Sequence, residues 1–264
     1  MSEPLPNAES ELRARRASSF GDHATAYAQH RPDYPRNALE WGLSGTSGTP
    51  RHVLDLGAGT GKVTTGLVEL GLDVTAVEPD AGMLAELSRI LPSVTALIGA
   101  AERIPSPDAT FDAVFVGQAF HWFDPDPAMT EIARVLRPGG VLVTLWNDED
   151  LSVPWVAEFN KLGKTGQSRE LGHFEETLRH PAFAPFARAS FRHVLRRTAE
   201  TLVQTIATHS HVIVSPPEES AAVLRKLREF LAANPETSSG EFDLPLQTTV
   251  FRAQRQGLVS GAAG

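Results

Sequence analysis

The sequence predicts an α/β protein built on a mostly parallel β-sheet with helices on both faces. Two observations carry this prediction: short apolar runs alternate with helical segments from residue 51 onward, and the first run leads directly into a glycine-rich turn, Gly57-Ala58-Gly59-Thr60-Gly61. Strands that are covered on both faces are apolar along their whole length, as these runs are. The 264 residues are enough for one such domain with a smaller cap.

Apolar runs and helix signals set the expected order of elements. Asp80 is a good N-cap, and Pro92 ends the helix that follows it. Five core strands are expected at residues 53–56, 74–77, 94–98, 113–116 and 141–145, with helices at 62–70, 80–91 and 128–136. The last of these helices is expected to close at Pro138-Gly139-Gly140.

Beyond residue 147 the alternation weakens. Helices are expected at 154–164 and 220–233, and two late strands at 190–195 and 247–252 complete a seven-stranded Rossmann-like sheet. We expect a flexible polar leader (1–19), a single domain (20–255) with its core at 50–147 and a helical cap from 20–45 and 148–245, and a tail (256–264).

Composition narrows the function. The chain has no cysteine, which excludes disulfides, thiolate metal sites and a cysteine nucleophile, and its scattered histidines suggest no metal site. The formal net charge of -8 disfavours a nucleic-acid partner. No apolar run reaches the roughly 18 residues of a membrane span, and no secretory signal is seen, so a cytoplasmic monomer or homodimer is expected.

The glycine-rich turn predicts a nucleoside cofactor. Ligands of open α/β sheets bind at the carboxyl ends of strands, and glycines allow a sharp turn and close approach of a ligand. Glu78 ends the second strand, 21 positions after Gly57, where an acid can accept hydrogen bonds from ribose hydroxyls.

Asp55 helps to choose the nucleoside. The glycines are spaced G-x-G-x-G rather than the G-x-G-x-x-G of a pyrophosphate site, and Asp55 stands two residues before the first of them. A carboxylate there would repel a pyrophosphate and suit an ammonium or sulfonium group. This favours S-adenosylmethionine over NAD, although an NAD-dependent oxidoreductase and an inactive cofactor-binding module remain as alternatives.

Five segments then resemble the motifs of class I S-adenosylmethionine-dependent methyltransferases. In chain order they are 53–62, 77–84, 99–105, 111–114 and 136–140. Two more segments, 27–35 and Gln118-Ala119-Phe120-His121-Trp122-Phe123, resemble the methyltransferase type 11 branch that includes trans-aconitate methyltransferase. A tyrosine is more usual in that branch at the positions of His211 and Leu246, which leaves the methyl acceptor open.

The resemblance implies a cofactor site, with S-adenosylhomocysteine as the product. Backbone at Gly57, Ala58 and Gly59 would pack against the methionine moiety, Glu78 would bind the ribose, and Gln118 would lie near the amino acid part. Around the adenine, the resemblance places Pro79, Met83, Ala101 and Glu102.

Methyl transfer to a small molecule needs alignment and a dry site more than it needs an acid or base. The expected acceptor atom is a carboxylate or hydroxyl oxygen, with nitrogen as a further option. His121 is a candidate base or positioning residue. Trp122, Tyr27 and Tyr34 are candidates to line the site and attract the sulfonium, and Arg31 to bind a carboxylate of the cofactor or the acceptor.

Overall fold

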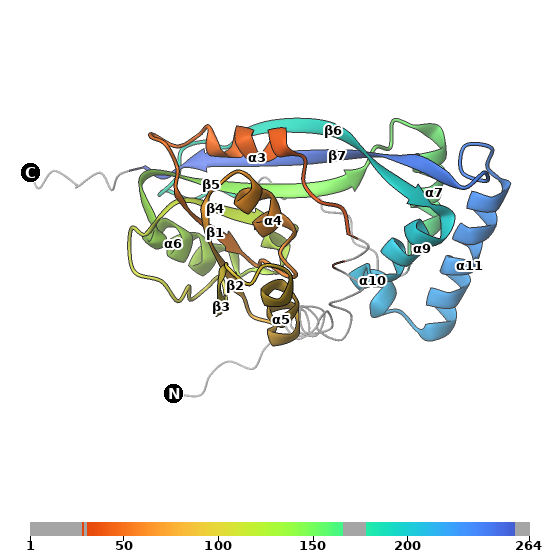
Figure 1. The fold of residues 1–264 in the computed structure, drawn as a ribbon, viewed down its shortest axis with the longest axis horizontal. Helices are drawn as coiled ribbons and strands as arrows, with labels where there is room; N and C mark the ends of the chain where they lie inside the picture. Colours follow the sequence, from red (N-terminus) through yellow and green to blue (C-terminus); the bar gives the residue numbers. More distant parts are fainter. Residues whose placement is uncertain (1–27, 29–30, 166–177, 257–264) are drawn as a thin grey trace, which may run out of the picture.

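The computed structural model describes residues 28, 31–165 and 178–256. They form one seven-stranded sheet with the order β3-β2-β1-β4-β5-β7-β6 (Figure 1). The strands are β1 (His52–Leu56), β2 (Asp73–Glu78), β3 (Thr95–Ile98), β4 (Phe111–Gly117), β5 (Leu136–Glu149), β6 (Ala187–Thr198) and β7 (Glu241–Gln254). The first five pair in parallel, and β7 pairs antiparallel with both β5 and β6. The predicted mostly parallel, seven-stranded sheet is therefore confirmed.

The strand order reverses at β1. The chain runs outward from β1 to β2 and β3, then returns to place β4 on the other side of β1. The ends of β1 and β4 therefore diverge into separate loops, and this is the switch point at which α/β sheets bind ligands. The glycine-rich turn follows β1 at this point.

Helices cover both faces of the sheet. The described helices are α3 (Arg36–Leu43), α4 (Lys62–Glu69), α5 (Ala81–Ile90), α6 (Pro125–Val135), α7 (Pro154–Gly163), α9 (Ala199–Ala207), α10 (Ser210–Ile213) and α11 (Pro217–Ala233), with a 3-10 helix η2 (Phe120–Trp122). Leu39 of α3 and Leu67 of α4 pack with Phe115 on one face, and Ile132 of α6 packs with Leu54 on the other. All of these side chains are fully buried, which drives the layers together.

A second apolar core lies beyond the first. Phe159 of α7, Ile206 of α9 and Leu227 of α11 pack against Phe242 and Leu244 of β7. Figure 1 shows these helices, with α10, gathered at the end of the long strands that lies away from α6. Strands β5, β6 and β7 thus extend past the first core and carry the helical cap.

Several boundaries differ from the expected ones. Strand β5 begins at Leu136 rather than Val141, so Pro138-Gly139-Gly140 lies inside a strand, and the β4–β5 register shifts between Phe111 and Ala113. Helix α3, within the segment 20–45 that we assigned to the cap, packs on the sheet. Helices α9 and α10 lie where no helix was predicted. The leader, Tyr27 and the tail after Gln256 fall outside the described residues.

Among the described residues, no helix is both long and apolar enough to cross a membrane.

Candidate cofactor and active site

The glycine-rich turn is fixed to the end of β2. The backbone N–H groups of Gly57 and Ala58 both donate to the carbonyl of Val77, over 2.8 and 3.1 Å. Gly57, Gly59 and Gly61 all have positive φ, of 70°, 55° and 90°. A side chain at Gly57 would place its Cβ 2.7 Å from that of Ala119, whereas at Gly59 the nearest atom would be the Met83 methyl at 3.9 Å. Gly57 therefore allows tight packing of the turn, and Gly59 leaves open space above it.

The Glu78 carboxylate stabilises the turn by accepting two backbone hydrogen bonds. Its Oε2 accepts from the N–H of Gly59 over 2.9 Å, and its Oε1 accepts from the N–H of Asp80 over 3.0 Å. Burial raises the pKa of this carboxyl, and both hydrogen bonds act in the opposite direction. Each carboxylate oxygen has a second lone pair, so Glu78 can bind two hydroxyls of a ligand while it keeps the turn in place.

Asp55 is buried beneath the same turn, with a side chain that is half satisfied. Oδ2 accepts from Thr64 Oγ1 over 2.6 Å, while the buried Oδ1 has no hydrogen-bond partner among the described residues. Burial raises the pKa of Asp55 to about 7. A buried oxygen without a partner costs free energy unless a ligand supplies a donor, so Asp55 marks a place for a cationic or hydrogen-bond-donating group.

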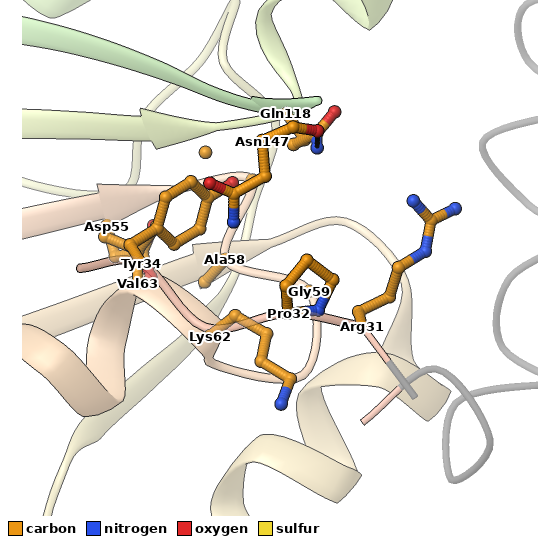
Figure 2. A pocket seen from close by; sticks show the side chains of 12 residues that line it. Arg31, Pro32, Tyr34, Asp55, Ala58, Gly59, Lys62, Val63, Gln118 and Asn147 are labelled. Atoms are coloured by element: carbon orange, nitrogen blue, oxygen red, sulfur yellow. Dashed lines mark hydrogen bonds between the residues drawn. The ribbon is translucent and has the colours of Figure 1, made fainter. Parts of the chain in front are cut away.

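A cavity opens at the carboxyl ends of β1, β4 and β5, above this turn (Figure 2). The lining residues come from the N-terminal segment, the turn, α4 and the strand ends: Arg31, Pro32, Tyr34, Asp55, Gly57, Ala58, Gly59, Lys62, Val63, Gly117, Gln118 and Asn147. The structure thus brings together seven of the residues selected from the sequence: Arg31, Tyr34, Asp55, Gly57, Ala58, Gly59 and Gln118.

Gln118, the first residue after β4, has an unusual backbone conformation. Its φ of 55° lies in the left-handed region that non-glycine residues rarely adopt. Its backbone N–H donates to Leu145, and its side-chain Nε2 donates to the carbonyl of Asn147 over 2.8 Å. Outliers of this kind concentrate where structure is held for function, and this one aims a side chain into the cavity from the strand end.

Lys62 and Asn147 line the cavity but were missed in the sequence. Lys62 begins α4 and forms an ion pair with Asp33 over 2.9 Å. Asn147 donates to the carbonyl of Asp33 over 3.1 Å and accepts from Thr248 Oγ1. Asn147 was not predicted because β5 was expected to end at Leu145. The strand continues beyond that residue and places Asn147 at the cavity.

Arg31 connects the cavity to the cap. Its Nε donates to Thr208 Oγ1 and its NH2 group to the Thr208 carbonyl, both over 3.1 Å. Thr208 is the C-cap of α9, so the guanidinium satisfies one of the carbonyls that a helix end leaves exposed. In Figure 2 the Arg31 side chain extends away from Asp55 and Tyr34.

The residues expected around an adenine lie on neighbouring loops. Met83 is buried in the first turn of α5, where its N–H donates to the N-cap Asp80. Pro79 follows Glu78 directly, and Glu102 accepts from the N–H of Asp124 over 2.8 Å. Ala101 is buried in the loop after β3. Met83 lies near Gly59 and Pro79 adjoins Glu78, and none of the four residues is among those lining the cavity.

His121 and Trp122 form η2 just after β4. Their rings lie 4.5 Å apart between centroids, and Phe120 beside them is buried against Phe123. This segment leads from Gln118 into α6, so it lies on the loop after β4 without lining the cavity described above.

Comparison with known proteins agrees with this geometry. Residues 54–144, which span β1 to β5, match the methyltransferase domain family. An uncharacterized methyltransferase of Mycobacterium tuberculosis is 42% identical over 236 residues, 89% of this chain and 95% of that protein. An uncharacterized methyltransferase of Schizosaccharomyces pombe is 30% identical over 247 residues, 90% and 97% of the two chains. A solved structure assigned to a type II methyltransferase of Anaeromyxobacter dehalogenans superposes with a TM-score of 0.67 at 27% identity, covering 85% and 97%.

The chain is a class I S-adenosylmethionine-dependent methyltransferase. Within that class it belongs with the uncharacterized methyltransferases of mycobacteria and fission yeast, which it matches over nearly their whole length. The prediction of a methyltransferase that uses S-adenosylmethionine is confirmed, and the alternative of an NAD-dependent oxidoreductase is wrong.

Proposed function

We propose that this methyltransferase moves the methyl group of S-adenosylmethionine to a small-molecule acceptor, at a carboxylate or hydroxyl oxygen, with an amine nitrogen as the less favoured option. The observation that carries the proposal is the cavity at the strand ends, one lining residue of which, Arg31, is held by hydrogen bonds to Thr208 of the cap. A cavity of this kind suits a small acceptor better than a polymer. The net charge of -8 also speaks against a nucleic-acid substrate.

The residues of the turn fit the cofactor that the family uses. Within the part of the chain that the structure describes, Asp55 Oδ1 has no hydrogen-bond partner, so it suits the cofactor's ammonium group. The open space next to Gly59 leaves room for the cofactor against the backbone of the turn. Glu78 has lone pairs for two ribose hydroxyls. We assign Gly57, Ala58 and Gln118 to the methionine moiety, and Pro79, Met83, Ala101 and Glu102 to the adenine.

The cofactor supplies a methyl group already activated by a sulfonium, so the protein has to align the acceptor and exclude water. Alignment alone can contribute about 7–11 kcal/mol. Tyr34, which lines the cavity, is the aromatic side chain that we assign to the sulfonium, an attraction of roughly 0.5–2 kcal/mol, and Tyr27 and Trp122 stay candidates for the same role. A carboxylate acceptor needs no base, whereas a hydroxyl or amine uses one, and His121 is the candidate for that role.

A carboxylate is the acceptor that the resemblance to trans-aconitate methyltransferase favours. Two segments, 27–35 and 118–123, carry that resemblance, and Arg31 of the first and Gln118 of the second line the cavity. Arg31 places a guanidinium, whose planar shape suits carboxylates, at the cap side of the cavity.

Calorimetry and an acceptor screen test the proposal. S-adenosylhomocysteine should bind the purified protein, and Glu78→Ala should weaken binding by about 1–3 kcal/mol because the ribose loses its partner. The matched control is Glu86→Ala, which removes a carboxylate from α5 that pairs with Arg89. Release of S-adenosylhomocysteine should then be followed with carboxylic acids, phenols and amines. Absence of cofactor binding refutes the assignment of the site, and binding without turnover on any of them supports an inactive cofactor-binding module instead.

A further inference from the structure

A short segment before α3 forms one wall of the cofactor cavity. Three of its residues line the cavity: Arg31, Pro32 and Tyr34. The fourth, Asp33, has a side chain that is 71% exposed. We call these four residues the wall segment. Tyr34 reaches the end of β4, because a Cβ added at Gly117 would lie 2.9 Å from the Tyr34 hydroxyl. The position of the wall segment therefore sets the shape of the cavity on this side.

Asn147 of β5 holds the backbone of the wall segment. Its side-chain Nδ2 donates to the carbonyl of Asp33 over 3.1 Å, and Asn147 itself is buried. A backbone carbonyl can only accept a hydrogen bond, so the amide nitrogen has to face it and the amide oxygen points elsewhere. Because the bond is made to the backbone, it does not depend on the side chain of Asp33.

Thr248 of β7 fixes the direction of the Asn147 amide. Its Oγ1 donates to Asn147 Oδ1, and Thr248 is fully buried. Strands β5 and β7 pair with Asn147 opposite Thr248, so the sheet itself brings the two side chains together. Thr248 is not among the residues that line the cavity. A residue outside the cavity thus orients one that lines it.

Two further contacts act at the same place. Gln118 donates from Nε2 to the backbone carbonyl of Asn147 over 2.8 Å, which ties the loop after β4 to β5. Lys62 pairs with the Asp33 carboxylate over 2.9 Å, and in the view of Figure 2 Asn147 lies above Pro32 and Lys62 below it. An ion pair with so exposed a carboxylate contributes little, because water and salt screen it. The hydrogen bond from buried Asn147 is therefore the stronger of these two attachments of Asp33.

We propose that Asn147 and Thr248 are positioning residues of the methyltransferase, which together hold the wall segment in place beside the cofactor. Thr248 orients the amide of Asn147, and that amide fixes the backbone of Asp33. This inference rests on the proposed function. Methyl transfer depends on alignment and on a dry site, so displacement of the wall segment should weaken cofactor binding although neither residue takes part in a bond that forms or breaks.

Fluorine NMR of the full chain can follow the wall segment directly. The chain has two tyrosines, so protein labelled with 3-fluorotyrosine gives one signal from Tyr27 and one from Tyr34, which Tyr27→Phe assigns. The Tyr34 signal should shift or broaden in Thr248→Val and return to its wild-type position in Thr248→Ser, which keeps the hydroxyl. The control is Thr144→Val, which removes a buried hydroxyl of β5 that has no hydrogen-bond partner among the described residues. It should leave the signal unchanged.

Calorimetry then connects the wall segment to cofactor binding. Thr248→Val and Asn147→Ala should each weaken binding of S-adenosylhomocysteine at least about fivefold at full stoichiometry. A partly unfolded variant would instead bind with wild-type affinity at reduced stoichiometry. The double variant should lose at most about twofold more than Asn147→Ala, because both changes remove the same contact. Asp33→Asn removes the ion pair but keeps the backbone carbonyl, so its loss should be smaller.

The outcomes separate this inference from the proposed function. Wild-type affinity in Thr248→Val overturns the inference and leaves the methyltransferase assignment intact. A loss of affinity with an unmoved Tyr34 signal overturns it too, because Asn147 would then serve the cofactor by direct contact. A loss in Asp33→Asn as large as that in Asn147→Ala assigns the positioning to the ion pair and also overturns it. Failure of the wild-type protein to bind S-adenosylhomocysteine refutes the proposed function itself.

Discussion

Thr64 of α4 donates a hydrogen bond of 2.6 Å to one oxygen of Asp55, while the other oxygen of that buried carboxyl has no partner among the described residues. The first contact fixes the direction of the side chain, and the second oxygen is left for a ligand. Asp55 is thus held in one position and keeps one buried oxygen for a ligand. Its replacement therefore tests the assignment of the ammonium group directly.

Asp55→Asn should stabilise the cofactor-free protein at pH 8 and weaken binding of S-adenosylhomocysteine by about 1–3 kcal/mol. Burial raises the pKa of Asp55 to about 7 from its ordinary value of 3.8. The folded state therefore holds the proton more tightly, and the wild-type protein should lose stability as pH rises from about 4 to about 7. Melting temperatures and calorimetry between pH 5 and 8 measure both effects. A variant with wild-type affinity at pH 8 would contradict the ammonium assignment.

Gly59→Ala should abolish cofactor binding while the protein still folds. The added Cβ meets only the Met83 methyl at 3.9 Å, so it enters the space left for the ligand. The left-handed backbone, with φ of 55°, costs an alanine about 1–2 kcal/mol. Gly71→Ala is the matched control, because Gly71 has φ of 79° and nothing within 4 Å of its added Cβ. We expect the two variants to have equal melting temperatures, and only Gly59→Ala to lose binding of S-adenosylhomocysteine.

Glu78→Gln should weaken binding of S-adenosylhomocysteine at least tenfold, by about 1.4 kcal/mol or more. The carboxylate accepts from Gly59 and Asp80, and an amide can offer only one acceptor oxygen to the two N–H groups. The glycine turn should therefore loosen as well as lose its ribose partner. Glu86→Gln in α5 serves as the control, and equal losses in both variants would argue against a role of Glu78 in the site.

His121→Gln should reduce kcat/KM by less than about tenfold if the acceptor oxygen is a carboxylate, since a general base typically contributes 10²–10⁴-fold. The pH dependence between 6 and 8 should keep its shape. The measurement is kcat/KM of the wild-type protein and of His121→Gln between pH 6 and 8, with an acceptor found in the screen. A hundredfold loss with a flattened pH profile would instead identify His121 as a base for a hydroxyl or amine acceptor.

Much of the fold was predictable because local signals and packing agree. Apolar runs placed the parallel strands within a few residues, and Asp80 marked the start of α5 as its N-cap. Long β5 was predicted too short because Pro138 and the two glycines after it are typical turn residues, yet pairing with β7 extends through the strand. Helix α9 was not predicted, although Thr198 and Thr201 form a capping box at its start; the helix packs against α11 and β7 in the core of the cap.

The cofactor end of the site was predictable for a different reason. The residues that form it, among them Gly59 and Glu78, lie only about 20 positions apart in the sequence. A short sequence motif can therefore predict how they meet. The acceptor end depends on contacts such as Arg31 with Thr208, which are separated by 177 positions. A sequence pattern does not show which residues so far apart in the chain will meet, and the place of Asn147 in the cavity was therefore found only in the structure.

Strand β7 runs from Phe251, in the core of the sheet, to Phe242, in the core of the cap. A continuous ladder of backbone hydrogen bonds to β5 and β6 accompanies it along that path. Among the described residues, paired strands therefore join the cap to the sheet, and we expect the two to move together rather than as separate rigid bodies. Entry of an acceptor must instead rely on movements of side chains and connecting segments around a fixed frame, and melting of the cap should draw the catalytic sheet with it in a single cooperative transition.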